Sequence, residues 1–518
     1  ALIMRRSIRR IPRKQEEIFK IKTDSNFIGL LRLGFLGILI LAQVAILILL
    51  SIWVAEVFVW YLVITAVLSI LCALSVIVSD KNSLSKTVWI LFLLVFFPVS
   101  FIVYILASDK LFFRGDKRKY QKIFDRTEQW IPKGVENDNE VAAYLKNAGG
   151  FGAYQNTKLT YFDTGAKLFD DVLTQIANAK KYVFIEFFIF SDGRLLNRIL
   201  NLVEPKIKEG LEVRIIYDSF GSHAKLKDKT YFKMIKMGIH VYSFNKLTPI
   251  LTFGQNYRDH RKYIIVDGKV AYTGGANLAD EYTNEKRMYG YWKDEGIKVE
   301  GEAVDRMILD FLRHYEFVSR KHEDFSQFMN LYEKQESKSL VVPYVDGLDY
   351  PVPIGKNAYL KLMMSAKKRL YIMTPYFVGD DPIYDVLKNK AMSGVDVRII
   401  LPDVPDKPLV YMVSMANAEA LLKYGIKIYT LNNCFVHSKV MLSDYETIMG
   451  SINIDMRSFY QQFESAVYTD DKEIIRDVNE DFQKSFEKST QIKPESAKKH
   501  NIFFRFFAII LQCWSPLM

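Results

Sequence analysis

Two copies of a histidine–lysine–aspartate pattern are the residues of this chain best suited to chemistry. They lie in DHRKYIIVDGKVAYTGGANLAD at 259–280 and in VHSKVMLSD at 436–444. Both fit His-x-Lys-x4-Asp, the first copy with His260, Lys262 and Asp267 and the second with His437, Lys439 and Asp444. The chain has only seven histidines, so the odds of two chance matches are on the order of one in a thousand. We therefore interpret the six residues as one composite catalytic site.

The pattern favours chemistry at phosphorus. Successive strand residues alternate between faces, so each histidine and the lysine two residues later point the same way. Two lysines can hold the oxygens of a phosphodiester while one neutral histidine attacks phosphorus. The other histidine, protonated, can donate to the leaving alkoxide and then act as a base towards the next alcohol. The sequence has no HExxH or clustered carboxylate signature, so we expect no metal or other cofactor.

Two carboxylates are candidates for orienting the histidines. A catalytic imidazole needs a partner that fixes its tautomer. Glu464 lies 27 residues after His437 in FESAVY, and Asp294 lies 34 residues after His260 in YWKDEGIKVEG. We predict that both orient a histidine; the alternative is that they are ordinary acids at strand edges.

The chain from about residue 155 onward is internally repeated. AKKYVFIEFFIF at 179–190 matches AKKRLYIMTPYF at 366–377, and EGLEVRII at 209–216 matches SGVDVRII at 393–400. Helical stretches alternate with these buried strands, which predicts an α/β fold of βα units. Two such halves imply a pseudo-twofold pair with the site at their interface. One difference is the longer segment 243–259 before His260, which either shapes substrate access or is a tolerated insertion.

Three uncharged or nearly uncharged apolar runs precede the repeat, at 33–55, 57–79 and 87–107. Each has about the 20 residues that a membrane span needs. Basic residues lie both before them, in RRSIRRIPRKQ, and after them, in DKLFFRGDKRKYQK. Three full spans cannot leave both basic segments in the cytoplasm. Either one run is re-entrant, with the third as first candidate because it contains Pro98, or the basic arm breaks the rule.

The predicted organisation has six parts. They are a basic arm (1–32), a membrane anchor (33–110), a first half (111–335), a linker rich in proline (336–356), a second half (357–490) and a C-terminal interfacial helix (491–518). The apolar part of the tail is too short to span a bilayer, so it either lies in the interface or docks on the protein surface.

The charge and the cysteines limit the classes of binding partner and of metal or disulfide site that we expect. The net charge of +11 favours anionic partners such as lipid headgroups, nucleic acid or phosphorylated metabolites. The three cysteines, Cys72, Cys434 and Cys513, are far apart, so we expect neither a disulfide framework nor a zinc site.

At these residues the chain resembles the phospholipase D superfamily, and within it the bacterial cardiolipin synthases. The two signature blocks HRKYIIVDGKVAYTGGANLADEY and GSINIDMRSFYQQFE carry the resemblance, together with IEFFIF, YDSFGS, TPYFV and YWKDEG. The resemblance implies two phospholipase D-like α/β/α sandwich halves behind N-terminal transmembrane helices in the bacterial inner membrane. The catalytic halves would face the cytoplasm.

The resemblance also implies a reaction and roles. Two phosphatidylglycerols would yield cardiolipin and glycerol, with His260 as nucleophile and His437 as general acid and then base. Lys262, Lys439, Asn277 and Asn453 would bind phosphate, while Asp267 and Asp444 at the turns would support loop structure more than chemistry. The expected partners are phosphatidylglycerol and anionic membrane lipid, without nucleic acid.

Other functions use the same residues. A phospholipase D would transfer to water, and a related synthase would transfer to another alcohol. A metal-independent nuclease fits the charge but leaves the apolar runs unexplained. A catalytically silent scaffold would not need both intact histidine–lysine pairs.

Overall fold

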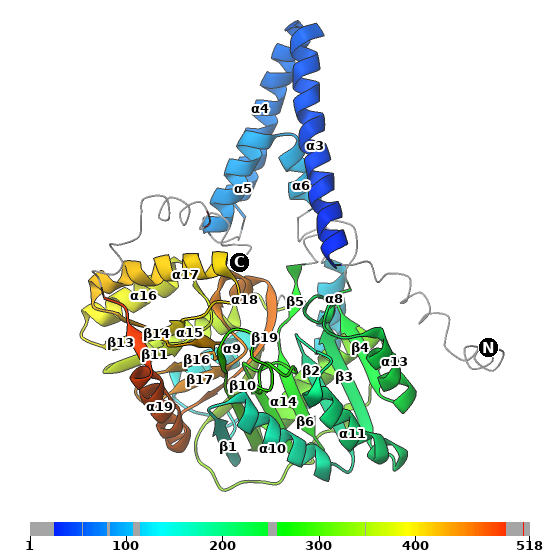
Figure 1. The fold of residues 1–518 in the computed structure, drawn as a ribbon, viewed down its shortest axis with the longest axis vertical. Coiled ribbons are helices and arrows are strands. Elements are labelled where there is room, and N and C mark those ends of the chain that lie inside the picture. The colour runs from blue at the N-terminus through cyan, green and yellow to red at the C-terminus, as the bar shows by residue number, and fades with distance from the viewer. Residues whose placement is uncertain are drawn as a thin grey trace, which may run out of the picture. The chain divides into compact units, whose positions relative to one another are not determined.

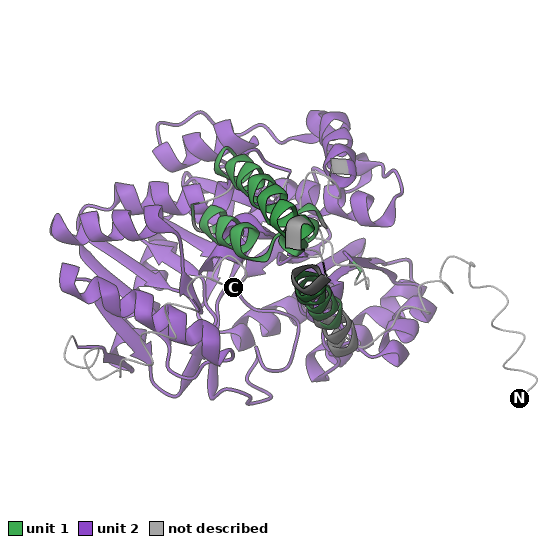
Figure 2. Cartoon of the chain, turned by 90° about the horizontal axis from the view of Figure 1, so that it is seen from above, with its two compact units in different colours: residues 1–112, 246–255 green, residues 113–245, 256–518 purple. Residues whose placement is uncertain are grey.

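The computed structural model of the chain describes residues 25–53, 55–79, 83–106, 114–246, 256–347, 349–493 and 511. The chain divides into two compact units, one of residues 1–112 and 246–255 and one of residues 113–245 and 256–518 (Figure 2). The basic arm as far as residue 24, residues 247–255 of the longer segment before His260, and most of the predicted C-terminal helix lie outside the described residues.

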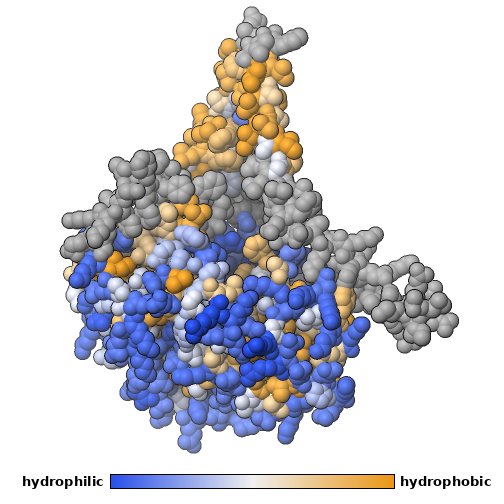
Figure 3. All heavy atoms as spheres, in the orientation of Figure 1, coloured by the Kyte–Doolittle hydropathy of each residue, from blue (hydrophilic) through white to orange (hydrophobic). Residues whose placement is uncertain are grey.

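The smaller unit is made of apolar helices. They are α3 (Ser25–Trp53), α4 (Ala55–Ile77), α5 (Ser83–Phe96) and α6 (Val99–Leu106). Large apolar side chains along these helices are exposed (Figure 3). They include Ile38, Leu41, Trp60, Leu71 and Leu74. A helix that is apolar all round and exposed is unsuited to water.

By length and composition, one helix among the described residues is long and apolar enough to cross a membrane, over Val57–Ile77. Gly37–Leu49 and Ser85–Phe96 are shorter apolar helices. The third run is divided into α5 and α6 around Phe97 and Pro98, and Pro98 is the residue that made this run the first candidate for a re-entrant segment. The physical reason is that proline has no N–H to continue the helical hydrogen bonds and its ring clashes with the preceding turn.

The first sheet of the larger unit has the order β1-β9-β7-β6-β2-β3-β4 (Figure 1). The β2–β3 and β3–β4 pairs are parallel and the other pairs antiparallel. Its strands are β1 (Thr157–Phe162), β2 (Tyr182–Phe187), β3 (Glu212–Asp218), β4 (His240–Phe244), β6 (Lys262–Val266), β7 (Val270–Gly274) and β9 (Gly296–Gly301).

The second sheet follows the same plan, in the order β10-β19-β17-β16-β11-β13-β14-β20. Its strands are β10 (Val341–Asp346), β11 (Arg369–Met373), β13 (Asp396–Pro402), β14 (Lys427–Leu431), β16 (Val440–Leu442), β17 (Thr447–Gly450), β19 (Gln462–Thr469) and β20 (Ser489–Gln491). From β10 to β14 each pair has the same direction as its counterpart in the first sheet. The segments that repeat in the sequence thus form strands at equivalent places, and the mixed α/β fold is confirmed.

Helices cover both sheets. They are α8 (Arg114–Thr127), α9 (Glu140–Gly149), α10 (Gly165–Asn178), α11 (Arg194–Lys208), α12 (Ser219–Ser222), α13 (Asp228–Met237), α14 (Val304–Ser319), α15 (Ile354–Ser365), α16 (Asp381–Met392), α17 (Pro408–Leu421), α18 (Met456–Tyr460) and α19 (Lys472–Glu487), with 3-10 turns η2 (Glu128–Trp130), η4 (Phe325–Gln327) and η5 (Leu422–Tyr424). Side-chain caps begin several of them: Asn139 accepts from Ala142 N at α9, and Asp471 accepts from Glu473 N at α19.

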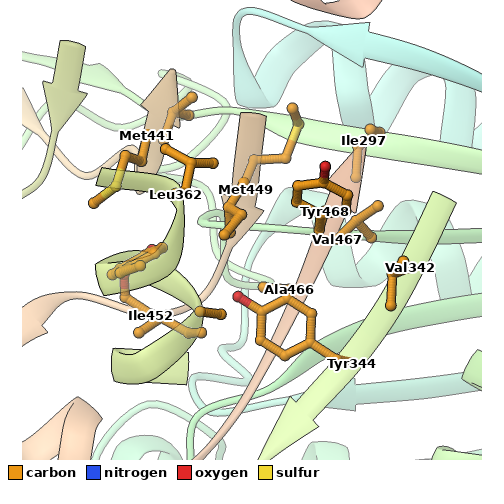
Figure 4. Close-up of a cluster of buried hydrophobic side chains, with 14 of the residues drawn as sticks. Ile297, Val342, Tyr344, Leu362, Met441, Met449, Ile452, Ala466, Val467 and Tyr468 are labelled. Atoms are coloured by element: carbon orange, nitrogen blue, oxygen red, sulfur yellow. The ribbon is translucent and has the colours of Figure 1, made fainter. Parts of the chain in front are cut away.

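The core follows from alternation along the strands. In β2, Val183 and Ile185 pack in one cluster with α10 and α11, whereas Phe184 packs in a second cluster with α14. The second cluster continues into the other sheet. Figure 4 shows part of it, with Ile297 of β9 near Val467 of β19. One continuous core therefore holds the two sheets in a fixed relation.

The predicted linker 336–356 is partly wrong. Six of its residues form β10, which pairs antiparallel with β19 at the edge of the second sheet. Pro343 lies within this strand, and an edge strand tolerates a residue without an N–H. The three prolines of the segment were therefore a poor signal for a linker. Likewise, β20 extends to Gln491, which was predicted to belong to the C-terminal helix.

Three short parallel pairings connect segments around the motifs. Strand β5 (Arg258–Asp259) pairs with the start of β19, and β15 (Cys434–Val436) pairs with β8 (Tyr291–Lys293). Each joins the segment before one histidine to the other half of the repeat. Strand β12 (Phe377–Val378) pairs with β18 (Ile454–Asp455) inside the second half.

Candidate active site

The two crossing pairings position the histidines. His260 follows β5, and its backbone N–H donates to the carbonyl of Phe463 at 2.8 Å. His437 follows β15, and its N–H donates to the carbonyl of Lys293 at 2.7 Å. The residue after each acceptor is a predicted orienting carboxylate, Glu464 or Asp294. Each histidine is therefore held beside the carboxylate of the opposite half.

His260 is paired with Glu464. Its Nδ1 lies 3.0 and 2.9 Å from the two carboxylate oxygens, and both side chains are buried. The hydroxyl of Ser451 donates to Glu464 Oε2. A carboxylate on Nδ1 fixes the N–H there and leaves Nε2 as the basic nitrogen.

His437 is paired with Asp294, with 2.8 Å between its Nδ1 and Asp294 Oδ2. This Nδ1 also lies 2.9 Å from Lys439 Nζ, a contact without a counterpart at His260 among the described residues. Both predicted carboxylates thus lie on a histidine Nδ1, but each on the histidine of the other half rather than the one from which its sequence distance was counted. Neither histidine Nε2 has a hydrogen-bond partner in the part of the chain that the structure describes.

Both motif lysines are buried beside their histidines. Lys262 Nζ donates to the carbonyl of His260, and Lys439 Nζ to that of His437. Burial lowers the pKa of Lys262 to about 7, although Glu464 acts in the opposite direction. Burial also lowers the pKa of Lys439. A buried ammonium lacks hydration, so an anion entering the site would be attracted strongly and would raise both pKa values.

The carboxylates differ in their proton affinity. Burial raises the pKa of Glu464 to about 7, against the effect of Lys262. Burial acts in the same direction on Asp294, but His437 and Lys439 outweigh it and its pKa lies below the usual value. Asp294 is therefore the more firmly ionised partner.

Both imidazoles are neutral in the empty site. Burial, followed by Lys262 and Lys439, lowers the pKa of His260 well below its ordinary value. Burial and then Lys439 lower the pKa of His437 to about 3, and Asp294 opposes them. A neutral imidazole is the form that can attack phosphorus.

The two asparagines of the motifs differ in their contacts. Asn277 Oδ1 accepts from Ile189 N at 3.0 Å, and its Nδ2 donates to the hydroxyl of Tyr282 at 2.9 Å. Asn453 is buried too, but its Oδ1 has no hydrogen-bond partner in the described part of the chain.

The motif aspartates lie away from the histidines. Asp267 is at the turn after β6, and its carboxylate accepts from the backbone N–H groups of Lys180, Lys181 and Tyr182 at 2.7 to 2.9 Å. Asp444 does the same for Lys367, Lys368 and Arg369. A direct catalytic role for them is therefore wrong. They fix the start of β2 and of β11 against the motif hairpins.

Sequence reasoning missed several site residues. Both oxygens of Glu295 lie 3.2 Å from Lys439 N, and burial followed by Asp294 raises its pKa to about 8. Aromatic rings surround His437, with centroids 5.2 to 5.8 Å away, whereas His260 has Phe188 at 5.1 Å. The rings at His437 are those of Tyr282, Trp292 and Phe435. The motif YWKDEG already placed Trp292 and Glu295 beside Asp294, which was the available signal.

A cluster of possible metal ligands lies behind His260. Oxygen and nitrogen atoms of Glu186, Asp259 and His314 lie within 4.8 Å of one another, all buried. The guanidinium of Arg261 lies 3.1 Å from Glu186 Oε1 and 3.0 Å from Asp259 Oδ1. Arg261 therefore already supplies the positive charge that a cation would bring, and the residues do not fit a metal well. Sequence reasoning found no clustered carboxylates because these come from β2, β5 and α14.

The arrangement is that of two half-sites, each giving a histidine, a lysine and a carboxylate, and it defines a phospholipase D-like protein. A family model described as "Cardiolipin synthase, PLD-like domain" matches residues 172–290 and 359–486. The chain belongs to the cardiolipin synthase family of this superfamily.

Curated relatives support this over most of the chain. The chain is 31% identical to "Cardiolipin synthase 1" of Staphylococcus aureus strain MRSA252, covering 88% of this chain and 97% of that protein. It is 30% identical to "Cardiolipin synthase" of Listeria monocytogenes serotype 4a, covering 89% and 99%. Among solved structures, phosphatidylserine synthase of Haemophilus influenzae matches with a TM-score of 0.54 at 15% identity, covering 73% of this chain and all of that one. This last likeness concerns the fold.

Proposed function

We propose that this chain is a membrane-bound phosphatidyltransferase that makes cardiolipin and glycerol from two phosphatidylglycerols. The observation that carries the proposal is the crosswise pairing of His260 with Glu464 and His437 with Asp294. It gives two imidazoles whose Nε2 atoms have no hydrogen-bond partner among the described residues, and two buried lysines, in a chain of the cardiolipin synthase family.

In the first step His260 Nε2 attacks the phosphorus of one phosphatidylglycerol. The P–N bond forms, the P–O bond to the headgroup glycerol breaks, and His437 gives its Nε2 proton to the departing alkoxide. The bound phosphodiester carries a negative charge, which raises the pKa of His437 above that of the empty site. Asp294 stabilises the imidazolium that must form.

In the second step the glycerol hydroxyl of another phosphatidylglycerol gives its proton to His437 Nε2 and attacks phosphorus. The P–N bond breaks and His260 becomes neutral again. Lys262 and Lys439 hold the phosphoryl oxygens in both steps, with Asn453 and the second N–H of the Asn277 amide as further donors. Both steps are reversible and need no nucleotide.

The proposed scaffold is two phospholipase D-like halves related by a pseudo-twofold axis. Each half gives one histidine–lysine pair and one carboxylate to the other half's histidine. The matching strand order of the two sheets, from β1 to β4 and from β10 to β14, supports this.

The proposal extends to the membrane. We place α3 and α4 as spanning helices and α5 with α6 as a re-entrant pair, since 14 residues rise about 21 Å and a bilayer core is about 30 Å thick. Two spans and a re-entrant pair leave both basic segments on the cytoplasmic side, as the charge rule requires. The catalytic halves then face the cytoplasm.

The test is a product assay with purified full-length protein in liposomes of phosphatidylglycerol. Cardiolipin and free glycerol should appear in equal amounts without added nucleotide or metal. Release of phosphatidic acid alone would identify a hydrolase instead. Cysteine accessibility on intact cells, with single cysteines placed before α3 and after α6, would test the topology.

A further inference from the structure

Asn277 and Asn453 occupy equivalent places after the two histidine–lysine motifs, but the residues four positions later have opposite charge. Four residues after Asn277 is Glu281, and four residues after Asn453 is Arg457. The positions are equivalent, because Leu278 bridges to Phe190 in parallel and Ile454 pairs in parallel with Phe377.

Around Asn277, protein contacts already satisfy the charged and polar side chains. Glu281 forms an ion pair with Lys225, with 2.9 Å between Lys225 Nζ and Glu281 Oε1. Asn277 uses both its oxygen and its nitrogen, as described above. This side of the site offers no unsatisfied charge.

Around Asn453, by contrast, buried polar atoms lack hydrogen-bond partners among the described residues. The Nε of Arg457 is buried without a hydrogen-bond partner, and no carboxylate of the described residues forms an ion pair with this guanidinium. The nearby acids are occupied elsewhere: Asp455 Oδ1 accepts from Ser458 N at 2.7 Å, and Asp218 accepts from Gly221 N and Asp259 N. Burial lowers the pKa of Arg457. Asp455 and Asp218 act against burial, but neither forms an ion pair with the guanidinium, so its charge is incompletely neutralised until an anion binds.

A second cation, the exposed Lys407, acts on the same carboxylate as Arg457, since both lower the pKa of Asp455 against burial. Lys407 Nζ is 4.6 Å from the centre of the Tyr376 ring and has no carboxylate partner among the described residues. Tyr376 directly precedes β12, and β12 pairs with β18, which leads into Arg457. Lys407 also acts on His260, whose pKa it helps to lower after burial and the motif lysines. Lys407 is therefore near enough to the reacting centre to act on His260, and Arg457 lies just after β18, the strand that pairs with β12.

We propose that Arg457 and Lys407 form a second anion subsite, which binds the phosphodiester of the acceptor phosphatidylglycerol. This deepens the proposed function and rests on it. The donor lipid has one phosphate, which is the group that His260 attacks and the motif lysines hold. Only the acceptor, and the cardiolipin made from it, brings a second phosphate. The open Oδ1 of Asn453 is then available to a hydroxyl of the acceptor's glycerol.

The subsite can be separated from the chemistry by changing the acceptor. Radiolabelled glycerol is an uncharged acceptor, and its incorporation into phosphatidylglycerol uses the same phosphohistidine and the same two histidines. It has no phosphate for Arg457 to bind. Cardiolipin formation and glycerol exchange are therefore measured on one preparation of full-length protein in phosphatidylglycerol liposomes.

Arg457→Gln should lower cardiolipin formation tenfold to a hundredfold, in line with a charge-assisted contact, and leave glycerol exchange within twofold. Arg457→Lys should recover part of the loss, and Lys407→Ala should show a smaller loss of the same kind. Arg476→Gln, an exposed arginine on α19 paired with Asp477, is the matched control and should change neither rate.

Equal loss of both rates in Arg457→Gln would overturn the subsite and assign Arg457 to folding, donor binding or general attraction of anionic lipid. No loss of either rate would overturn it as well. Failure of the proposed function looks different: the unaltered protein would then give neither cardiolipin nor glycerol exchange.

Discussion

His260 and His437 stand at the same place in two sheets of the same strand order, but their surroundings differ in charge. His260 is paired with Glu464, whose pKa burial raises to about 7, and lies in front of the ionic cluster of Arg261 and Asp259. His437 is paired with Asp294, which stays ionised. The two histidine–carboxylate pairs thus have similar positions, but their carboxylates differ in proton affinity.

The difference teaches how a duplicated unit can divide two roles. An ionised Asp294 favours the imidazolium form of His437, which a general acid needs. The aromatic rings around His437 exclude water and strengthen this electrostatic effect. Glu464 gives the imidazolium form of His260 weaker support, so His260 is better kept neutral, which suits its proposed role as the nucleophile. At the two positions that correspond to Asp259 and Arg261 the second half has Val436 and Ser438.

The largest expected effect separates the two histidines. His260→Ala should lower cardiolipin formation by about 10⁴-fold or more, because no phosphohistidine can form. His437→Ala should also lose turnover but should still trap a phosphohistidine on His260 from a substrate with an activated leaving group. Mass spectrometry of the labelled peptide checks this. A label on His437 in the His260→Ala variant would reverse the two roles.

Next in size is the loss of a motif lysine. Lys262→Met and Lys439→Met keep the length of the side chain and remove its charge, and each should cost about 10²–10³-fold in turnover. The measurement is the initial rate of cardiolipin formation, with circular dichroism to check the fold. Full activity in both variants would refute the phosphate clamp.

A smaller and unequal effect is expected for the two carboxylates. Asp294→Asn should lower turnover about 10²-fold at neutral pH, since His437 loses an anion that stabilises its protonated form. Glu464→Gln should cost about tenfold, because Glu464, with a pKa of about 7, is already partly protonated there. Equal losses would show that the charge difference between the two pairs has no bearing on the division of roles.

The pH profile sharpens the same comparison. The pKa of Lys262 is about 7 in the empty site, so kcat/KM should fall as the pH rises through this value and the ammonium is lost. The alkaline limb of kcat should lie at higher pH, since bound phosphodiester stabilises the ammonium. Glu464→Gln should move the alkaline limb of kcat/KM to lower pH, because it removes a negative charge that stabilises the ammonium form of Lys262. A limb that stays in place in this variant would contradict the coupling.

The strands and the candidate side chains could be predicted from the sequence, but not which carboxylate pairs with which histidine. The repeats at 179–190 and 366–377 mark β2 and β11 because parallel strands with two covered faces are apolar throughout. Distance from a histidine also led to Asp294 and Glu464. The exchange of partners depends on β5 and β15 crossing to the other half, and such contacts leave no local periodicity. For the same reason, the sequence does not show that Arg457 Nε lacks a hydrogen-bond partner among the described residues. Nor does it show that Glu186, Asp259 and His314 form a cluster.

The smallest effect on activity is expected at the motif aspartates, where the two halves should behave alike. Asp267→Ala or Asp444→Ala removes the acceptor for three backbone N–H groups, and each should cost about 2 kcal/mol in unfolding free energy. Turnover of the folded protein should change less than threefold, since neither carboxylate touches the histidines. Thermal unfolding in detergent measures the first effect and the rate of cardiolipin formation the second.

Asp267→Asn is the control for the first of these turns. Asp267 has a φ of +54°, a conformation that asparagine tolerates well, and asparagine keeps one acceptor oxygen. Stability should therefore fall less than in the alanine variant. If either aspartate variant instead lost activity a hundredfold at unchanged stability, the third residue of that motif would act on the reaction, and the two halves would differ at the turns as well as at the histidines.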